Sequence, residues 1–234
     1  MMQTTPWHER DSTIEEEHRF KRLLSLHALT QCWTQVLDNT DSNLIERMPK
    51  ITLNQNLWLL EKARVDEITL ELSALVGSQN IQEFLKELEE TIWLIQISTL
   101  ENAFSQTSDP ALLKNLLKNA SWSQGKKTAE QDWPNLPFTT LTDAYQAFTE
   151  SHVNGKSGFL LGSAANQELG FYWKKSPIQN PSLNRSAQLE MLCELHSEWV
   201  HGFFYGLSRV IRCISQTVKA ESDSWIEFTL LLTY

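Results

Sequence analysis

Apolar residues recur every three or four positions along most of the chain up to residue 153, which is the spacing of one face of a helix. Residues that end helices separate the apolar segments: a run of turn formers over 38–43, Gly77, and a Trp-Pro pair at 133–134. The pattern therefore predicts five helices, over residues 12–37, 52–76, 80–106, 110–132 and 142–153.

Asn80 marks the start of the third helix and Pro110 the first position of the fourth, and the first and fifth helices carry capping residues. Ser12 or Thr13 is followed by a glutamate at the spacing of a capping box, in which a hydroxyl and a carboxylate each bond the other residue's backbone N–H. Glu15 or Glu16 is the expected partner. Thr142 is the expected cap of the fifth helix, because threonine side chains accept hydrogen bonds from the free N–H groups of a first helical turn.

The pattern changes toward the C-terminus. Short aromatic and aliphatic segments over 156–163 and 168–174 predict a hairpin. A long amphipathic helix follows from Ser186, and residues 213–219 and 224–232 then predict two further strands. Helices and strands segregated in this way are typical of an α+β fold. We expect an N-terminal helical region followed by a helix-rich unit in which a four-stranded antiparallel sheet packs on the long helix.

We place a domain boundary near residue 108, between a helical region over residues 1–108 and an α+β domain over 109–234. The residues around this boundary lack the glycine- and serine-rich composition of a flexible linker. We therefore expect the two parts to pack together.

Composition and charge narrow the classes of partner. The 234 residues are 41% hydrophobic and carry a net charge of −9, which suits a globular protein and disfavours a nucleic-acid partner or an anionic membrane. No apolar run approaches the roughly 20 residues that cross a bilayer, so we expect no direct membrane insertion. Three irregularly spaced cysteines and a polar first segment predict a cytoplasmic protein without a disulfide framework.

Two glycines in the long predicted helix call for an explanation. Gly202 and Gly206 lie four residues apart and so share one helix face, although each costs a helix about 1 kcal/mol relative to alanine. We predict that another backbone packs closely against them, and the sheet is the expected neighbour.

The order of elements over residues 110–234 resembles the 4-vinyl-reductase-type small-molecule-binding domain. It is also similar to the amino-thiazoline-carboxylate hydrolase family and, in fold, to TRAPP-type subunits. Four features carry the resemblance: the helix with a Gly-Lys-Lys at 125–127, the hairpin that ends at Pro177, the Gly-Phe-Phe-Tyr-Gly at 202–206, and the Ile-Glu-Phe at 226–228. Cysteines typical of those binding domains are absent here, so the resemblance implies the scaffold without their thiolate chemistry.

One polar face of the long helix could carry chemistry. Glu194, Glu198 and His201 sit at i, i+4 and i+7, and two carboxylates with an imidazole are able to bind a metal or exchange protons. The competing interpretation is a solvated polar face, which we favour, and we predict no metal site and no cofactor. His196 falls in the apolar stripe and is expected to be a hydrogen-bonded core histidine.

Aromatic residues provide two further candidates. An apolar pocket between the long helix and the sheet would be lined by five of them: Tyr172, Trp173, Phe203, Phe204 and Tyr205. Trp7 lies in a polar segment where no core is expected, and it is a candidate anchor for a partner protein.

These observations favour a non-catalytic adaptor or scaffold subunit of a cytosolic bacterial multiprotein complex, with other protein subunits as partners. A secretion-system coupling complex is one setting of this kind. The alternatives are a sensor that binds a small apolar ligand, and a hydrolase of the amino-thiazoline-carboxylate type. The absence of a catalytic motif weighs against an enzyme.

Overall fold

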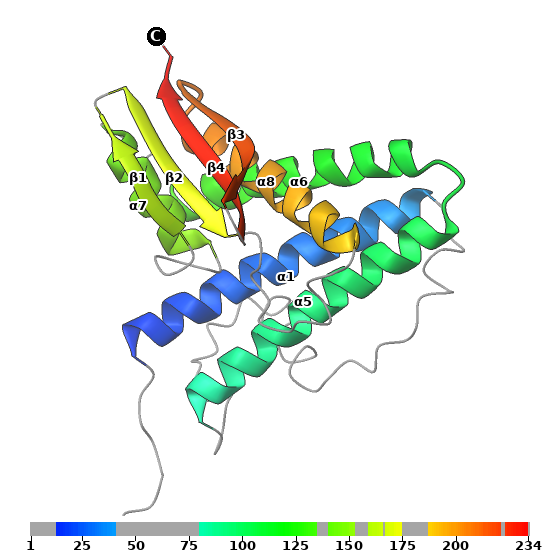
Figure 1. Cartoon of the computed structure of the whole chain (residues 1–234). Helices are drawn as coiled ribbons and strands as arrows, with labels where there is room; N and C mark the ends of the chain where they lie inside the picture. The colour runs from blue at the N-terminus through cyan, green and yellow to red at the C-terminus, as the bar shows by residue number, and fades with distance from the viewer. Residues whose placement is uncertain are drawn as a thin grey trace, which may run out of the picture.

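The structure is a computed structural model that describes residues 13–40, 80–134, 140–152, 159–165, 167–174, 187–220 and 223–233. Figure 1 shows how the helices and the sheet are arranged, and buried residues from both form one hydrophobic core. Trp7 and the helix predicted over residues 52–76 lie outside the described residues, so these two predictions stand as they were made.

In the described N-terminal part of the chain, helices α1 (Ile14–Thr40) and α5 (Ile81–Gln106) lie side by side and run in parallel (Figure 1). Their contacts advance together along both helices. The amide Nε2 of Gln82 donates to Glu16 Oε1 at 2.7 Å. Further along both helices, the amide Nε2 of Gln96 donates to the Thr30 hydroxyl at 2.9 Å. Buried apolar residues fill the space between them.

Capping explains where several helices begin. The predicted box at α1 is formed by Thr13 and Glu16, whose side chains accept from each other's backbone N–H at 3.3 and 2.8 Å. The side chain of Asn80 caps α5 by accepting hydrogen bonds from the backbone N–H groups of Gln82 and Glu83. The prediction for the fifth helix is corrected: Thr140, not Thr142, is the cap of α7 (Leu141–Ser151), because its hydroxyl and the carboxylate of Asp143 complete a capping box.

Two further helices form the centre of the molecule. These are α6 (Pro110–Asp132) and α8 (Ala187–Leu207), and their bounds agree with the helices predicted from the sequence. The indole Nε1 of Trp33 on α1 donates to the hydroxyl of Ser121 on α6 at 2.8 Å, both side chains being buried. The N-terminal helices and the α+β unit therefore share one core.

The predicted four-stranded antiparallel sheet is confirmed. It consists of β1 (Phe159–Ala164), β2 (Glu168–Lys174), β3 (Ile211–Ala220) and β4 (Asp223–Leu232), in the order β1-β2-β4-β3. The pairing of β1 with β2 shifts by one residue at Gly162, which is a bulge in this edge strand.

One face of the sheet is buried against the helices. Phe171 on β2 and Phe228 on β4 are paired in register, and their rings stack with centroids 5.0 Å apart. Phe148 of α7 and Phe204 of α8 pack against the Phe171 ring from the helical side, at 5.4 and 6.0 Å. The fold is therefore α+β, with the sheet packed on helices that include the long α8 (Figure 1).

Among the residues that the structure describes, none of the helices combines the length and the apolar character that crossing a bilayer requires.

Candidate functional site

The backbones of α6 and α8 are in direct contact. A Cβ atom added to Gly202 would lie 1.9 Å from the carbonyl oxygen of Trp122, and one added to Gly125 would lie 2.0 Å from the carbonyl oxygen of Trp199. A Cβ on Gly206 would lie 2.6 Å from the carbonyl oxygen of Lys126. The sheet was the expected neighbour of Gly202 and Gly206, and this is corrected: the backbone that approaches them belongs to helix α6.

The contacts between α6 and α8, called the seam from here on, keep a constant register. Lys114 meets Glu194, Lys118 meets Glu198, Trp122 meets Gly202 and Lys126 meets Gly206, and the partners are 80 positions apart in each case. Because both members advance by four residues at each step, α6 and α8 are parallel and pack along one face of each helix. The seam therefore places the proposed catalytic face of α8 directly beside a lysine-bearing face of α6.

Two lysines of α6 hold the candidate carboxylates of α8. Lys114 Nζ lies 2.6 Å from a carboxylate oxygen of Glu194. Lys118 Nζ lies 3.4 Å from Glu194 and 3.5 Å from Glu198. Nδ1 of His201, one turn further, lies 3.5 Å from the other carboxylate oxygen of Glu198. Each predicted catalytic carboxylate is thus an ion-pair partner of α6.

The electrostatics of the seam favour fully ionised carboxylates. The hydrogen bond with His201 is the largest cause that lowers the pKa of Glu198, and Lys118 adds to it. Burial alone would raise the pKa of Glu194, but Lys114 and Lys118 together bring it below its ordinary value. A carboxylate with a lowered pKa is a weak general base and holds no proton to donate near neutral pH. Within the described ranges, no group of three or more His, Cys, Asp or Glu side chains is placed to hold a metal ion.

The structure separates the five aromatic residues that were predicted to line one pocket. Trp173, Phe203 and Phe204 are fully buried in the core. Tyr172 points to the opposite face of β2, where its hydroxyl donates to Glu227 at 2.8 Å. Tyr205 is 37% exposed and packs on Trp122, with centroids 5.1 Å apart. The two tyrosines therefore lie away from the three core aromatics.

His196 is a neutral core histidine, as its position in the apolar stripe predicted. It is 1% exposed, and its Nε2 lies 3.1 Å from the amide oxygen of Gln96. The amide nitrogen of Gln96 donates to Thr30 and to the carbonyl of Leu26, so the oxygen faces the imidazole and His196 Nε2 carries the hydrogen. Burial lowers the pKa of His196 to about 3, which keeps the ring uncharged.

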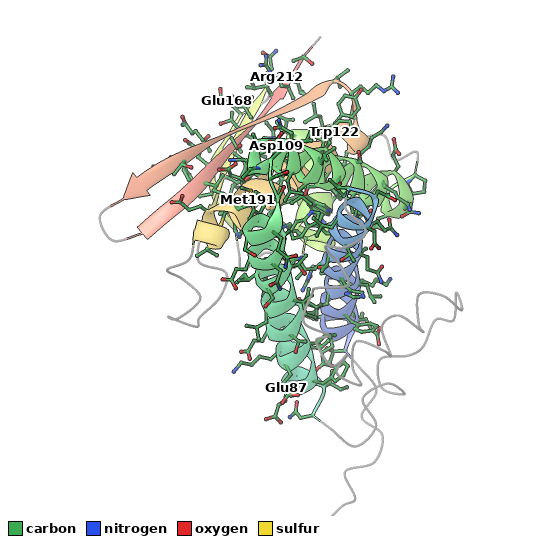
Figure 2. All side chains as sticks on the ribbon, turned by 90° about the vertical axis from the view of Figure 1, so that its right-hand side faces the viewer. Glu87, Asp109, Trp122, Glu168, Met191 and Arg212 are labelled. Carbon is green, nitrogen blue, oxygen red and sulfur yellow. The ribbon has the colours of Figure 1, made fainter. Side chains whose placement is uncertain are left out.

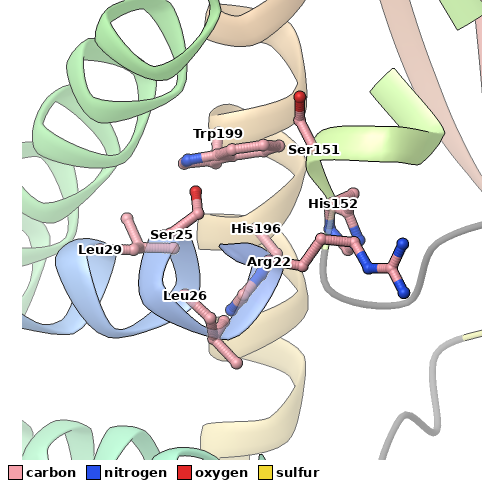
Figure 3. A pocket seen from close by; sticks show the side chains of 8 residues that line it. All are labelled: Arg22, Ser25, Leu26, Leu29, Ser151, His152, His196 and Trp199. Carbon is pink, nitrogen blue, oxygen red and sulfur yellow. The ribbon is translucent and has the colours of Figure 1, made fainter. Parts of the chain in front are cut away.

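A small hollow that sequence reasoning did not anticipate lies next to this histidine. Figure 3 shows it between α1, the end of α7 and α8. Its lining residues are Arg22, Ser25, Leu26, Leu29, Ser151, His152, His196 and Trp199. The space open to the centre of a water molecule is about 10 Å³, which is enough for about one ordered water. One signal for it was available: Arg22 falls on the same α1 face as Leu26 and Leu29 (i, i+4, i+7), so its stem had to enter the core.

The lining of the hollow combines apolar side chains with a few polar groups, and Arg22 is the charged residue among them. Burial lowers the pKa of His152 well below its ordinary value, and His196 and Arg22 add to this effect. The guanidinium of Arg22 pairs with Glu15 at 3.0 Å, on the surface side. Within the described part of the chain, three buried atoms here have no hydrogen-bond partner: Arg22 Nε, Ser25 Oγ and Trp199 Nε1. The Ser25 hydroxyl points toward the Trp199 ring (Figure 3), as expected of a site for one bridging water.

No family model, curated protein or solved structure matches this chain.

Proposed function

We propose that this protein is a non-catalytic adaptor or scaffold subunit of a cytosolic bacterial multiprotein complex, with other protein subunits as its partners. A secretion-system coupling complex is one setting that would use such a subunit. The protein would contribute binding surfaces on a rigid scaffold, which the close contact between α6 and α8 would hold together.

The observation that carries the proposal is the state of the candidate catalytic residues. Glu194 and Glu198 are engaged by Lys114 and Lys118 across the contact between α6 and α8. An acid–base pair needs at least one group with a pKa near the working pH, and lysine contacts move carboxylates away from that range. These residues fix the register of two helices, which is a structural role.

Surface features provide the positive support. Single exposed apolar residues are ordinary, but aromatic residues are enriched where proteins bind one another. Tyr205 and Trp122 form an aromatic pair at the surface, and the ammonium of Lys126 lies 5.9 Å from the Tyr205 ring centroid. Val210 and Ile214, around the start of β3, are 52% and 43% exposed. These groups lie on the α6–α8 seam and on one edge of the sheet.

A small-molecule sensor and a hydrolase are the alternatives, and neither is favoured by an observation of its own. The hollow beside His196 has room for about one water molecule, whereas pockets for organic ligands are usually of several hundred Å³. A hydrolase would need Glu194, Glu198 or His201 to be available for proton transfer.

Affinity purification of the tagged full-length protein from its native cells tests the proposal. The preparation is washed at increasing salt concentration and its mass is measured by light scattering. We expect a fixed set of protein subunits in constant stoichiometry. A protein that elutes alone, at the mass of a monomer, would contradict the adaptor function.

A further inference from the structure

Strand β3 is an edge of the sheet with one unused side. In the order β1-β2-β4-β3, it pairs with β4 along all ten of its residues, from Ile211 to Ala220. None of the residues that the structure describes pairs with its other side. An edge strand of this kind presents a row of free backbone N–H and C=O groups, which another extended chain is able to bind.

The pairing identifies which backbone groups face outward. The N–H of Thr233 donates to the carbonyl of Val210, so the backbone of Val210 faces β4. Successive residues of an antiparallel strand turn their backbone N–H and C=O groups to opposite sides. The N–H of Ile211 accordingly faces away from β4 and donates to the carbonyl of Ser208. The same alternation turns the N–H and C=O groups of three residues to the free side: Cys213, Ser215 and Thr217.

Within the described ranges, no segment covers this edge where it leaves the helical layer. The side chains of residues 214–217 are exposed on both faces of the strand. Figure 2 shows the β3–β4 hairpin extending beyond the helices. The opposite edge strand β1 is shorter and carries the bulge at Gly162, a feature that discourages further pairing. β3 has no proline, and its register with β4 is unbroken.

We propose that the free edge of β3 binds an extended segment of a partner protein as a fifth strand. This inference rests on the proposed adaptor function and specifies how the partner is held. Backbone hydrogen bonds to Cys213, Ser215 and Thr217 provide the affinity, and side chains on both faces of the strand provide the selectivity. Ile214, which is 43% exposed, offers the apolar contact on the outer face.

Charge identifies the chemistry of the partner segment. Arg209 and Arg212 are exposed at the start of β3, and neither forms an ion pair with another described residue. They form a local basic site on a chain whose net charge is −9. β3 itself contains no acidic residue, but Glu221 and Asp223 follow it in the sequence, so a second copy of the chain is the competing occupant, and the oligomeric state tests it. The occupant is therefore a segment with alternating apolar residues and at least one carboxylate near Arg212.

A matched pair of variants isolates the edge. Ser215→Pro removes an outward N–H that has no partner within the described chain, whereas Ser215→Ala keeps it. The probe is a fluorescein-labelled peptide of alternating valine and threonine with a glutamate at each end, and binding is followed by fluorescence anisotropy. A second peptide carries lysines in place of the glutamates. Thr217→Pro repeats the test in case Ser215→Pro does not fold, as judged by thermal unfolding.

We expect the acidic peptide to bind the wild type and the Ser215→Ala variant equally, and to bind Ser215→Pro about tenfold more weakly, the effect of losing about 1.4 kcal/mol. Arg212→Glu should reverse the preference between the acidic and the basic peptide. Equal binding by the proline variants, or no binding of either peptide, would overturn the proposal. A dimer that dissociates on Ser215→Pro would also overturn it, because the occupant would then be a second copy.

The same variants separate this inference from the proposed function. If partner subunits copurify with wild type and remain bound to Ser215→Pro, the edge strand is not their docking site, and the adaptor function stands. If no subunit copurifies with wild type, the adaptor function itself fails.

Discussion

Gly202 of α8 rests directly on the main-chain carbonyl of Trp122 of α6, with no space between them for even one methyl group. The reciprocal contact, Gly125 against the carbonyl of Trp199, lies about one turn away on the other side of the seam. Two parallel helices are thereby held at backbone contact, and everything carried on their faces is fixed in register.

The first prediction concerns this contact. Gly202→Ala should lower the free energy of unfolding by about 1–3 kcal/mol, the usual cost of overpacking, even though alanine is the better helix former. Urea unfolding followed by circular dichroism measures the change. Ser123→Ala, at an exposed position of α6, is the matched control and should change stability by less than about 0.5 kcal/mol. An alanine variant of Gly202 as stable as wild type would show that the helices do not meet here.

A second prediction concerns the ion pairs of the seam. Replacing Glu194 and Glu198 by glutamine should reduce the free energy of unfolding by only about 0.2–1 kcal/mol per pair, because these side chains are partly solvated. The loss should shrink at high salt. Glu130→Gln, which removes a pair within α6, is the control for a pair that does not join two helices. A loss of several kcal/mol that salt does not change would contradict this account.

The buried glutamine at the centre of the core gives a third prediction. Gln96 is fully buried and bonds α1 and α8 at the same time, through Thr30, the carbonyl of Leu26 and His196. Gln96→Leu should lower the free energy of unfolding by about 1–3 kcal/mol for each buried polar group that it leaves without a hydrogen-bond partner. Chemical unfolding measures this, with Gln106→Leu at an exposed position of the same helix as the control. A leucine variant of unchanged stability would mean that this network does not connect the helices.

Stability should fall as the pH is lowered from 7 to 5. His152 and His196 are buried and uncharged, and their pKa values in the folded protein lie below the ordinary value of 6.5. The unfolded chain therefore binds more protons as the pH falls through 6.5, and stability is fully present above that pH. Below pH 6.5, each histidine lowers the free energy of unfolding by about 1.4 kcal/mol per pH unit. This dependence ends at the pKa of the histidine in the folded protein, which is about 3 for His196.

Urea midpoints at pH 7.5, 6.5, 5.5 and 5.0 test this dependence. His196→Gln keeps a side-chain N–H for Gln96 but cannot gain a proton, so its midpoint should depend less steeply on pH. Glu194 and Glu198 have lowered pKa values, and their contribution is lost only below their ordinary range, so these two carboxylates do not add to the dependence above pH 5. A wild-type midpoint that stays constant from pH 7.5 to 5.0 would contradict the burial of neutral imidazoles.

Local signals in the sequence were enough to place most of the described elements. Thr13 with Glu16, Asn80 before α5, and Pro110 at the start of α6 act within one helical turn, so their effect could be read without the rest of the fold. Thr140 was missed although a signal was present: Asp143 stands three residues later, the spacing of a capping box, and Thr142 has no acidic residue at that spacing.

The parts that sequence reasoning could not place depend on contacts between distant segments. The spacing of Gly202 and Gly206 indicated a close neighbour, but only the fold reveals that Gly125 makes α6 that neighbour. The pairing of Lys118 with Glu198 has the same origin, because nothing in either helix alone fixes an offset of 80 positions. The hollow joins Arg22 of α1, His152 of α7 and Trp199 of α8, and its existence depends on how three elements pack.

The central claim is that the residues resembling a catalytic site are structural and that the protein acts by binding other proteins. Its most direct test compares the wild type with a variant in which Glu194, Glu198 and His201 are all replaced by glutamine. Both are purified from native cells through the same tag, and their masses are compared by native mass spectrometry. We expect the same stoichiometric set of partner subunits with both. A wild-type protein that elutes alone, or partners lost from the glutamine variant while its fold is intact, would contradict it.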